Sequence, residues 1–179
     1  MTVTPRLRKL LLTAHVVSSV GWLGAVIAYL ALVFAALTSE EAQTVRAALL
    51  AMELTYFVLV PLAFASLWTG VVQSLGSAWG LFRHYWVIFK FLLTVVATIV
   101  LLLNMQTVIS LADLAAATDG ADLPDAGGQL LHAGIGLLVL FLTTILAVYK
   151  PRGMTRHGQR KQHELRMRGQ DQPPTALVS

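Results

Sequence analysis

An uncharged segment, residues 10–37, restricts the fold of this chain more than any other feature of the sequence. The hydrocarbon core of a bilayer is about 30 Å thick, and about 20 apolar residues of helix cross it. The segment is long enough to cross with a tilt. Three more apolar segments follow, at about 47–75, 84–111 and 129–149. The sequence therefore predicts an all-α membrane protein, a bundle of four transmembrane helices.

Composition agrees with this fold class. Hydrophobic residues make up 56% of the chain and charged residues only 12%, which is far from the usual composition of a soluble domain. The absence of cysteine excludes disulfides and thiolate metal sites. The first apolar run is too long for the core of a signal peptide, so we interpret it as a retained helix. We expect a basic arm at 1–9, a transmembrane domain at 10–150 and a flexible basic tail at 151–179.

The positions of the positive charges predict the topology. Of the 13 Lys and Arg residues, three lie in residues 1–9, one in 76–83 and seven from Lys150 onward, whereas the other two loops hold only Arg46. Positive loops stay in the cytoplasm, so both termini are predicted to be cytoplasmic. The same rule explains the high pI without nucleic acid as a partner. The tail is expected to contact anionic lipid.

The first predicted helix carries one polar and aromatic face. At about 100° per residue, five side chains fall within roughly one third of its circumference: His15, Ser18, Ser19, Trp22 and Tyr29. An ionisable residue inside a membrane span indicates a functional site unless it only bonds to a neighbouring helix. Both interpretations of His15 remain open from the sequence.

The remaining ionisable and amide side chains fall into two layers under the predicted topology. His15, His84 and Lys90 lie toward the cytoplasmic side, and Lys90 is close enough to the helix end to snorkel to the surface. Glu53, Asn104 and His132 lie toward the outer side. The two layers are a crude two-site arrangement, or only the usual polarity of helix ends. We expect Glu53 to pair with His132 or Asn104, because an unpaired carboxylate in lipid is costly.

Haem b is the cofactor that fits this composition best. It needs axial histidines and an apolar pocket between helices, and it does not require cysteine. His15 and His84 are predicted at similar depth on different helices, so they are the candidate iron ligands, with Trp22 beside them in the pocket. His132 is predicted at the opposite side and is excluded from this pair. A zinc site is less favoured, because catalytic zinc requires three clustered protein ligands.

Two further functions remain open. One is a proton or ion path through Glu53, Lys90 and His132, since intramembrane ionisable residues mark such relays. The other is an accessory or assembly subunit without catalysis, whose partner is another membrane protein or a second copy. The chain has no nucleophile elbow, phosphate-binding loop or metalloprotease motif, and the acidic loop at 112–128 lacks the spacing of an EF-hand. These absences favour the accessory subunit.

Two short motifs resemble a known group. The stretch HVVSSVGWLG, beginning at His15, resembles the opening helix of small bacterial multi-span proteins of the copper-resistance-D-like group. The stretch YWVIFKFLLT, beginning at Tyr85, resembles their W-x-x-x-K helix. The resemblance covers residues 10–150 and implies a bacterial cytoplasmic membrane protein with histidine ligands for copper or haem. The scarcity of intramembrane methionine and the absence of cysteine argue against copper transport.

Overall fold

The computed structural model describes residues 4–76, 84–118 and 123–149, with 153, 155, 159–160, 163 and 167. Four long α-helices dominate this part of the chain. Each is long and apolar enough to cross a membrane, which confirms the predicted all-α class and the four candidate spans. Most of the predicted tail lies outside the described residues. The helices are α1 (Pro5–Thr38), α2 (Ala42–Gly76), α3 (Tyr85–Ala117) and α4 (Gly127–Tyr149).

The helices extend beyond the predicted apolar segments. Pro5 stands in the first turn of α1, where its missing N–H is not needed and its fixed φ favours a helix. The basic residues expected in an extended arm therefore form the first turns of α1. The third apolar segment was predicted to end at about residue 111, but α3 continues to Ala117. Asp113 is therefore a helical residue and not part of the acidic loop. The alanine-rich stretch around Asp113 has high helix propensity.

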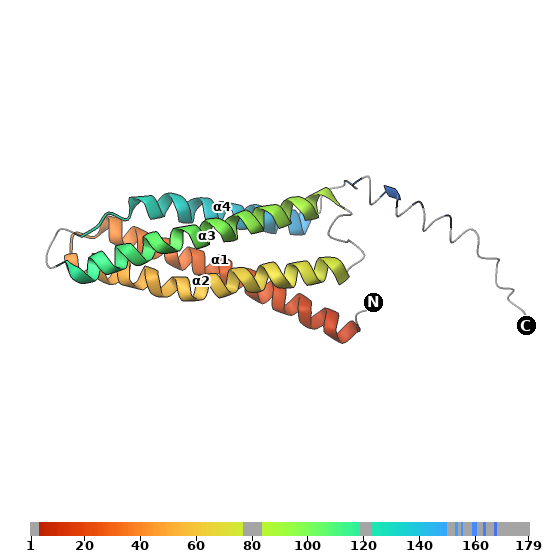
Figure 1. The fold of residues 1–179 in the computed structure, drawn as a ribbon, viewed down its shortest axis with the longest axis horizontal. Coiled ribbons are helices and arrows are strands. Elements are labelled where there is room, and N and C mark those ends of the chain that lie inside the picture. Colours follow the sequence, from red (N-terminus) through yellow and green to blue (C-terminus); the bar gives the residue numbers. More distant parts are fainter. Residues whose placement is uncertain are drawn as a thin grey trace, which may run out of the picture.

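The helices pack side by side in a fixed order of neighbours (Figure 1). α1 packs against α2 and α4, and α3 packs against the same two helices. Within the described residues, the backbones of α1 and α3 do not come close to each other, and neither do those of α2 and α4. The start of α1 and the end of α4 lie at the same end of the molecule. Residues on diagonally opposite helices therefore meet only across the interior.

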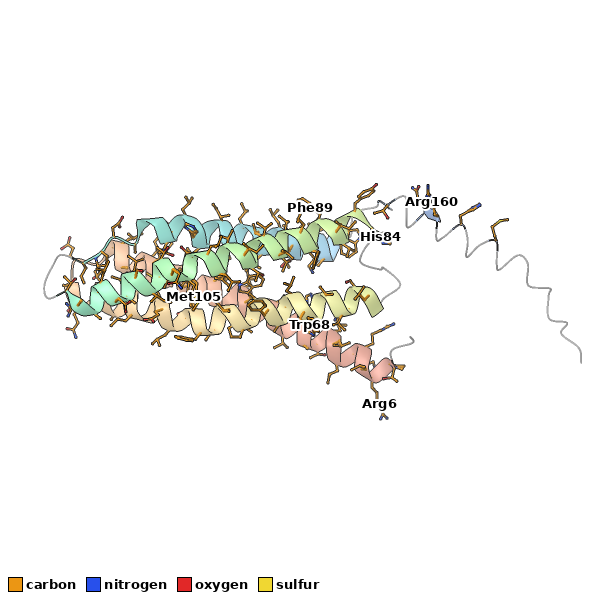
Figure 2. The ribbon with its side chains drawn as sticks, in the orientation of Figure 1. Arg6, Trp68, His84, Phe89, Met105 and Arg160 are labelled. Carbon is orange, nitrogen blue, oxygen red and sulfur yellow. The ribbon has the colours of Figure 1, made fainter. Side chains whose placement is uncertain are left out.

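Apolar side chains occupy both the interior of the bundle and its outer surface. The interior holds a cluster of buried apolar residues that includes Val33, Leu49 and Met52. Large apolar side chains also cover the outside of every helix (Figure 2), and Trp68 is 72% exposed. Such exposure would cost free energy in water, whereas lipid chains solvate it. The outer surface thus has the character expected of a protein surrounded by lipid.

Candidate functional site

One buried polar side chain from each helix meets at a single point, which we call the four-helix node: Tyr29, Tyr56, Asn104 and Gln129. The Tyr29 hydroxyl donates to Gln129 Oε1 at 2.9 Å. Asn104 Nδ2 donates to the Tyr56 hydroxyl oxygen at 2.8 Å and to Gln129 Oε1 at 2.7 Å. Gln129 Nε2 donates to Asn104 Oδ1 at 3.4 Å. The node joins all four helices through side-chain hydrogen bonds.

The node is isolated from solvent. Its four side chains are between 2% and 7% exposed, and the Tyr29 and Tyr56 rings meet edge to face with centroids 5.6 Å apart. Water is absent from the hydrocarbon region, so polar groups there must be satisfied by other protein groups. Asparagine and glutamine suit this task because each amide both donates and accepts. The polar groups of the node hydrogen-bond to one another and so hold the four helices together.

The expected pairing of Glu53 with His132 or Asn104 is wrong. Asn104 bonds to Tyr56 and Gln129 instead. His132 is exposed, and its Nδ1 bonds to the Gly128 carbonyl of its own helix at 3.0 Å. For His132 the reason is the order of neighbours, because the α2 and α4 backbones do not pack against each other. For Asn104, whose helix does neighbour α2, the reason is that its amide bonds within the node. Glu53 makes no hydrogen bond or ion pair with any described residue.

A second polar contact, the α1–α2 seam, lies nearer the start of α1. His15 Nδ1 is 3.1 Å from both the Ser66 carbonyl and Thr69 Oγ1, and Ser19 Oγ is 2.7 Å from Ser66 Oγ. A carbonyl only accepts, so Nδ1 carries the proton of the neutral imidazole and Nε2 keeps a lone pair. His15 thus helps to hold α1 against α2, which corresponds to the simpler of its two predicted roles.

Gly70 provides the space for this histidine. A Cβ atom at Gly70 would lie 3.1 Å from His15 Cε1, closer than carbon atoms pack without strain. Gly70 was not predicted from the sequence. The feature that could have indicated a close helix contact there is its position one residue after Thr69, on a helix rich in small side chains.

The other predicted ligand residues lie apart from the seam. His84 is buried just before α3, and its ring lies 6.5 Å from that of Trp86, measured between centroids. α3 does not pack against α1, so the described contacts of His15 are with α2. Trp22 is buried in the apolar core. In the described ranges, no three His, Cys, Asp or Glu side chains are grouped to hold a metal ion.

Lys90 and Arg46 are two basic residues within the helices α3 and α2. Lys90 is half-buried on α3. No hydrogen bond among the described residues links Lys90 to Glu53 or His132. Arg46, at the start of α2, donates to the Thr118 carbonyl after α3. It thereby satisfies a carbonyl at a helix end that has no partner within the helix.

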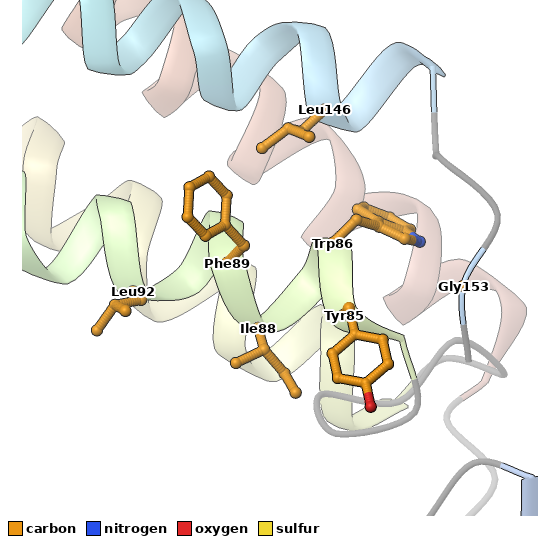
Figure 3. Close-up of a pocket in the computed structure, with 7 residues that line it drawn as sticks. All are labelled: Tyr85, Trp86, Ile88, Phe89, Leu92, Leu146 and Gly153. Atoms are coloured by element: carbon orange, nitrogen blue, oxygen red, sulfur yellow. The ribbon is translucent and has the colours of Figure 1, made fainter. Parts of the chain in front are cut away.

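Two hollows mark the outer surface. The first lies beside the start of α3 and the end of α4 and is almost entirely apolar; Figure 3 shows Phe89 and Leu146 facing across it, with Tyr85 and Trp86 at the same end of α3. The second lies between α2 and α3 and contains Glu53. The first contains no predicted ligand residue.

Comparison with known proteins gave no match to this chain, whether with protein families, curated proteins or solved structures.

Proposed function

We propose that the chain is an accessory or assembly subunit without catalysis of its own, a four-helix bundle in the bacterial cytoplasmic membrane. It would associate laterally with another membrane protein or with a second copy of itself. The observation that carries this proposal is the four-helix node, in which one buried polar side chain from each helix bonds to the others. A catalytic or transport site would need polar groups left available to a substrate.

The topology proposed for this subunit places both termini in the cytoplasm. The asymmetry of positive charge motivates it, and the shared end of α1 and α4 is compatible with it. Alkaline phosphatase and green fluorescent protein fused after Gly120 and after Ser179 test it. We expect phosphatase activity only at Gly120 and fluorescence only at Ser179. Fluorescence from the Gly120 fusion would contradict the proposal.

One observation favours a second candidate function, a b-type haem redox subunit with His15 as an iron ligand. Histidines that bind metals usually donate their other ring N–H to a carbonyl, which fixes the ring. His15 has this arrangement, since Nδ1 faces the Ser66 carbonyl and Nε2 remains an acceptor. The second ligand proposed from the sequence is His84. Haem would supply one-electron transfer between a quinone or protein partner and the subunit.

Extraction of the tagged chain in native-lipid discs, without detergent, separates the two candidates. For an accessory subunit, we expect a mass above that of the 19.4 kDa monomer, a fixed stoichiometry, and no visible absorption. Deletion of the gene should then lower the abundance of the partner identified in the discs. A matched extraction of an unrelated four-span protein controls for lipid-driven co-extraction.

The same preparation can refute the primary proposal. A purely monomeric mass in the discs would contradict lateral association. A Soret band that is lost in His15→Ala but kept in His132→Ala would establish the haem candidate instead. His132 is a suitable control because it bonds within its own helix and faces outward.

A further inference from the structure

The groove between α2 and α3 combines an apolar wall with one charged side chain. It encloses about 160 Å³ and opens on the outer surface. Tyr56, Phe57 and Val60 form the α2 side, and Met105 and Ile109 belong to the α3 side. Figure 2 shows Met105 where the two helices run beside each other. Glu53 is the only carboxylic acid lining this hollow, and no lysine, arginine or histidine lines it.

The carboxylate of Glu53 lacks a counter-charge in the described ranges. Arg46, two turns earlier on α2, donates from Nη2 to the Thr118 carbonyl, and its buried Nε has no partner among the described residues, so neither nitrogen is bonded to Glu53. The amide of Asn104, the nearest polar partner predicted from the sequence, belongs to the four-helix node. Removing a carboxylate from water is costly unless a partner compensates its charge. A cation bound in the groove would provide that compensation.

The wall of the groove determines which kind of cation fits. Calcium takes six to eight oxygen ligands, and magnesium demands a nearly complete octahedron. Glu53 supplies one carboxylate, and the rest of the wall is apolar or aromatic. An organic ammonium needs no such shell, because its methyl or methylene groups pack against apolar atoms. An ammonium over the ring of Phe57, which lines the groove, would also gain cation–π attraction. The chemistry therefore selects an organic cation over a metal ion.

The direction of the groove determines the shape of the ligand. Glu53 lies nearer the start of α2, and Pro61 lies eight residues further along the helix, about 12 Å at the rise of an α-helix. The charged end is thus nearer the end of the helices and the apolar end is deeper. An amphipathic molecule in a membrane has this same order, with its head at the surface and its chain inside.

We propose that the α2–α3 groove binds a single-chain amphipathic ammonium ion, with its head on Glu53 and its chain along Val60 and Pro61. This site is separate from the proposed lateral association and does not depend on it. A phospholipid is less suitable, because its phosphate would bring a second negative charge beside Glu53.

Titration calorimetry with octyltrimethylammonium tests the proposal on the full chain in dodecylmaltoside micelles. We expect saturable binding at one site per chain, above the heat measured with empty micelles. Glu53→Gln should weaken it by about tenfold or more, whereas Glu40→Gln, at an exposed carboxylate on the same side of the molecule, should leave it unchanged. Val60→Trp fills the groove without removing the charge and should also abolish binding.

Three results would overturn the proposal. One is equal affinity in the wild type and Glu53→Gln. Another is displacement of the probe by millimolar calcium or by phosphatidylethanolamine, which would indicate a metal or phospholipid site. The third is equally strong binding of a neutral analogue with a tert-butyl group in place of the trimethylammonium head. Because the last two comparisons use the wild-type protein, they remain valid if a variant does not fold.

Discussion

Gln129→Leu is expected to lower the free energy of unfolding by about 3 kcal/mol, since each buried donor left without an acceptor costs about 1–3 kcal/mol. Gln129 Oε1 accepts from both Tyr29 and Asn104. Leucine has a similar volume to glutamine and is hydrophobic. A loss of stability in Gln129→Leu would therefore not come from a large cavity or from a polar side chain facing lipid. The desolvated hydroxyl and amide are the expected cause.

Equilibrium unfolding in mixed dodecylmaltoside and dodecyl sulfate measures this loss, with tryptophan fluorescence as the signal. Gln106→Leu is the matched control, because Gln106 is an exposed glutamine on α3, and it should change stability by less than about 0.5 kcal/mol. Tyr29→Phe should cost less than Gln129→Leu, about 0.6–1 kcal/mol, because Gln129 keeps its bond from Asn104. If Gln129→Leu and Gln106→Leu were equivalent, the node would not hold the four helices together.

Gly70→Val is expected to destabilise the protein by about 2 kcal/mol through overpacking of the α1–α2 seam. The added Cβ would meet His15 Cε1 at 3.1 Å, so the imidazole must shift, and its contacts with the Ser66 carbonyl and Thr69 are strained. The weakening of these contacts adds to the steric cost. The same unfolding measurement reports the change.

Two comparisons separate this clash from a general effect of valine in a helix. Gly24→Val is the first, because a Cβ at Gly24 meets no atom within 4 Å. The second is the double variant Gly70→Val with His15→Ala, in which the removed imidazole leaves room for valine. Its stability should equal or exceed that of Gly70→Val alone. If His15→Ala lowered the free energy of unfolding of the Gly70→Val protein by as much as it lowers that of the wild type, the two residues would not be in contact.

The helices were predictable because membrane spans follow from length and hydropathy, which are local properties. Their ends were less so. Asp113 was predicted to lie in a loop because it is charged, yet α3 continues through the alanines around it. A charge terminates an apolar segment in the sequence, but it does not terminate a helix that projects beyond the hydrocarbon core.

The site was predictable only in part, because facing residues depend on which helices are neighbours. Tyr29 was predicted on the polar face of the first helix, and Asn104 was predicted in the outer polar layer. Tyr56 was missed, although it continues a stripe of residues three to four apart that includes Met52, Leu59 and Ala63, since its ring belongs to the apolar stripe and only its hydroxyl to the node. Glu53 was assigned His132 on α4 or Asn104 on α3 as its partner, and no local pattern reveals that α2 and α4 are not neighbours or that Asn104 bonds elsewhere.

The four-helix node also has a consequence for how the chain enters a membrane. Helices that emerge in sequence can form the Asn104–Tyr56 bond once the third is in place. The Tyr29 hydroxyl must wait for Gln129, which α4 supplies last. Until then a polar group of the first helix faces lipid without its final acceptor, an unfavourable state in hydrocarbon. Arrival of the fourth and shortest helix therefore completes assembly, and a chain truncated before Gly127 would remain an unfinished intermediate exposed to quality-control proteases.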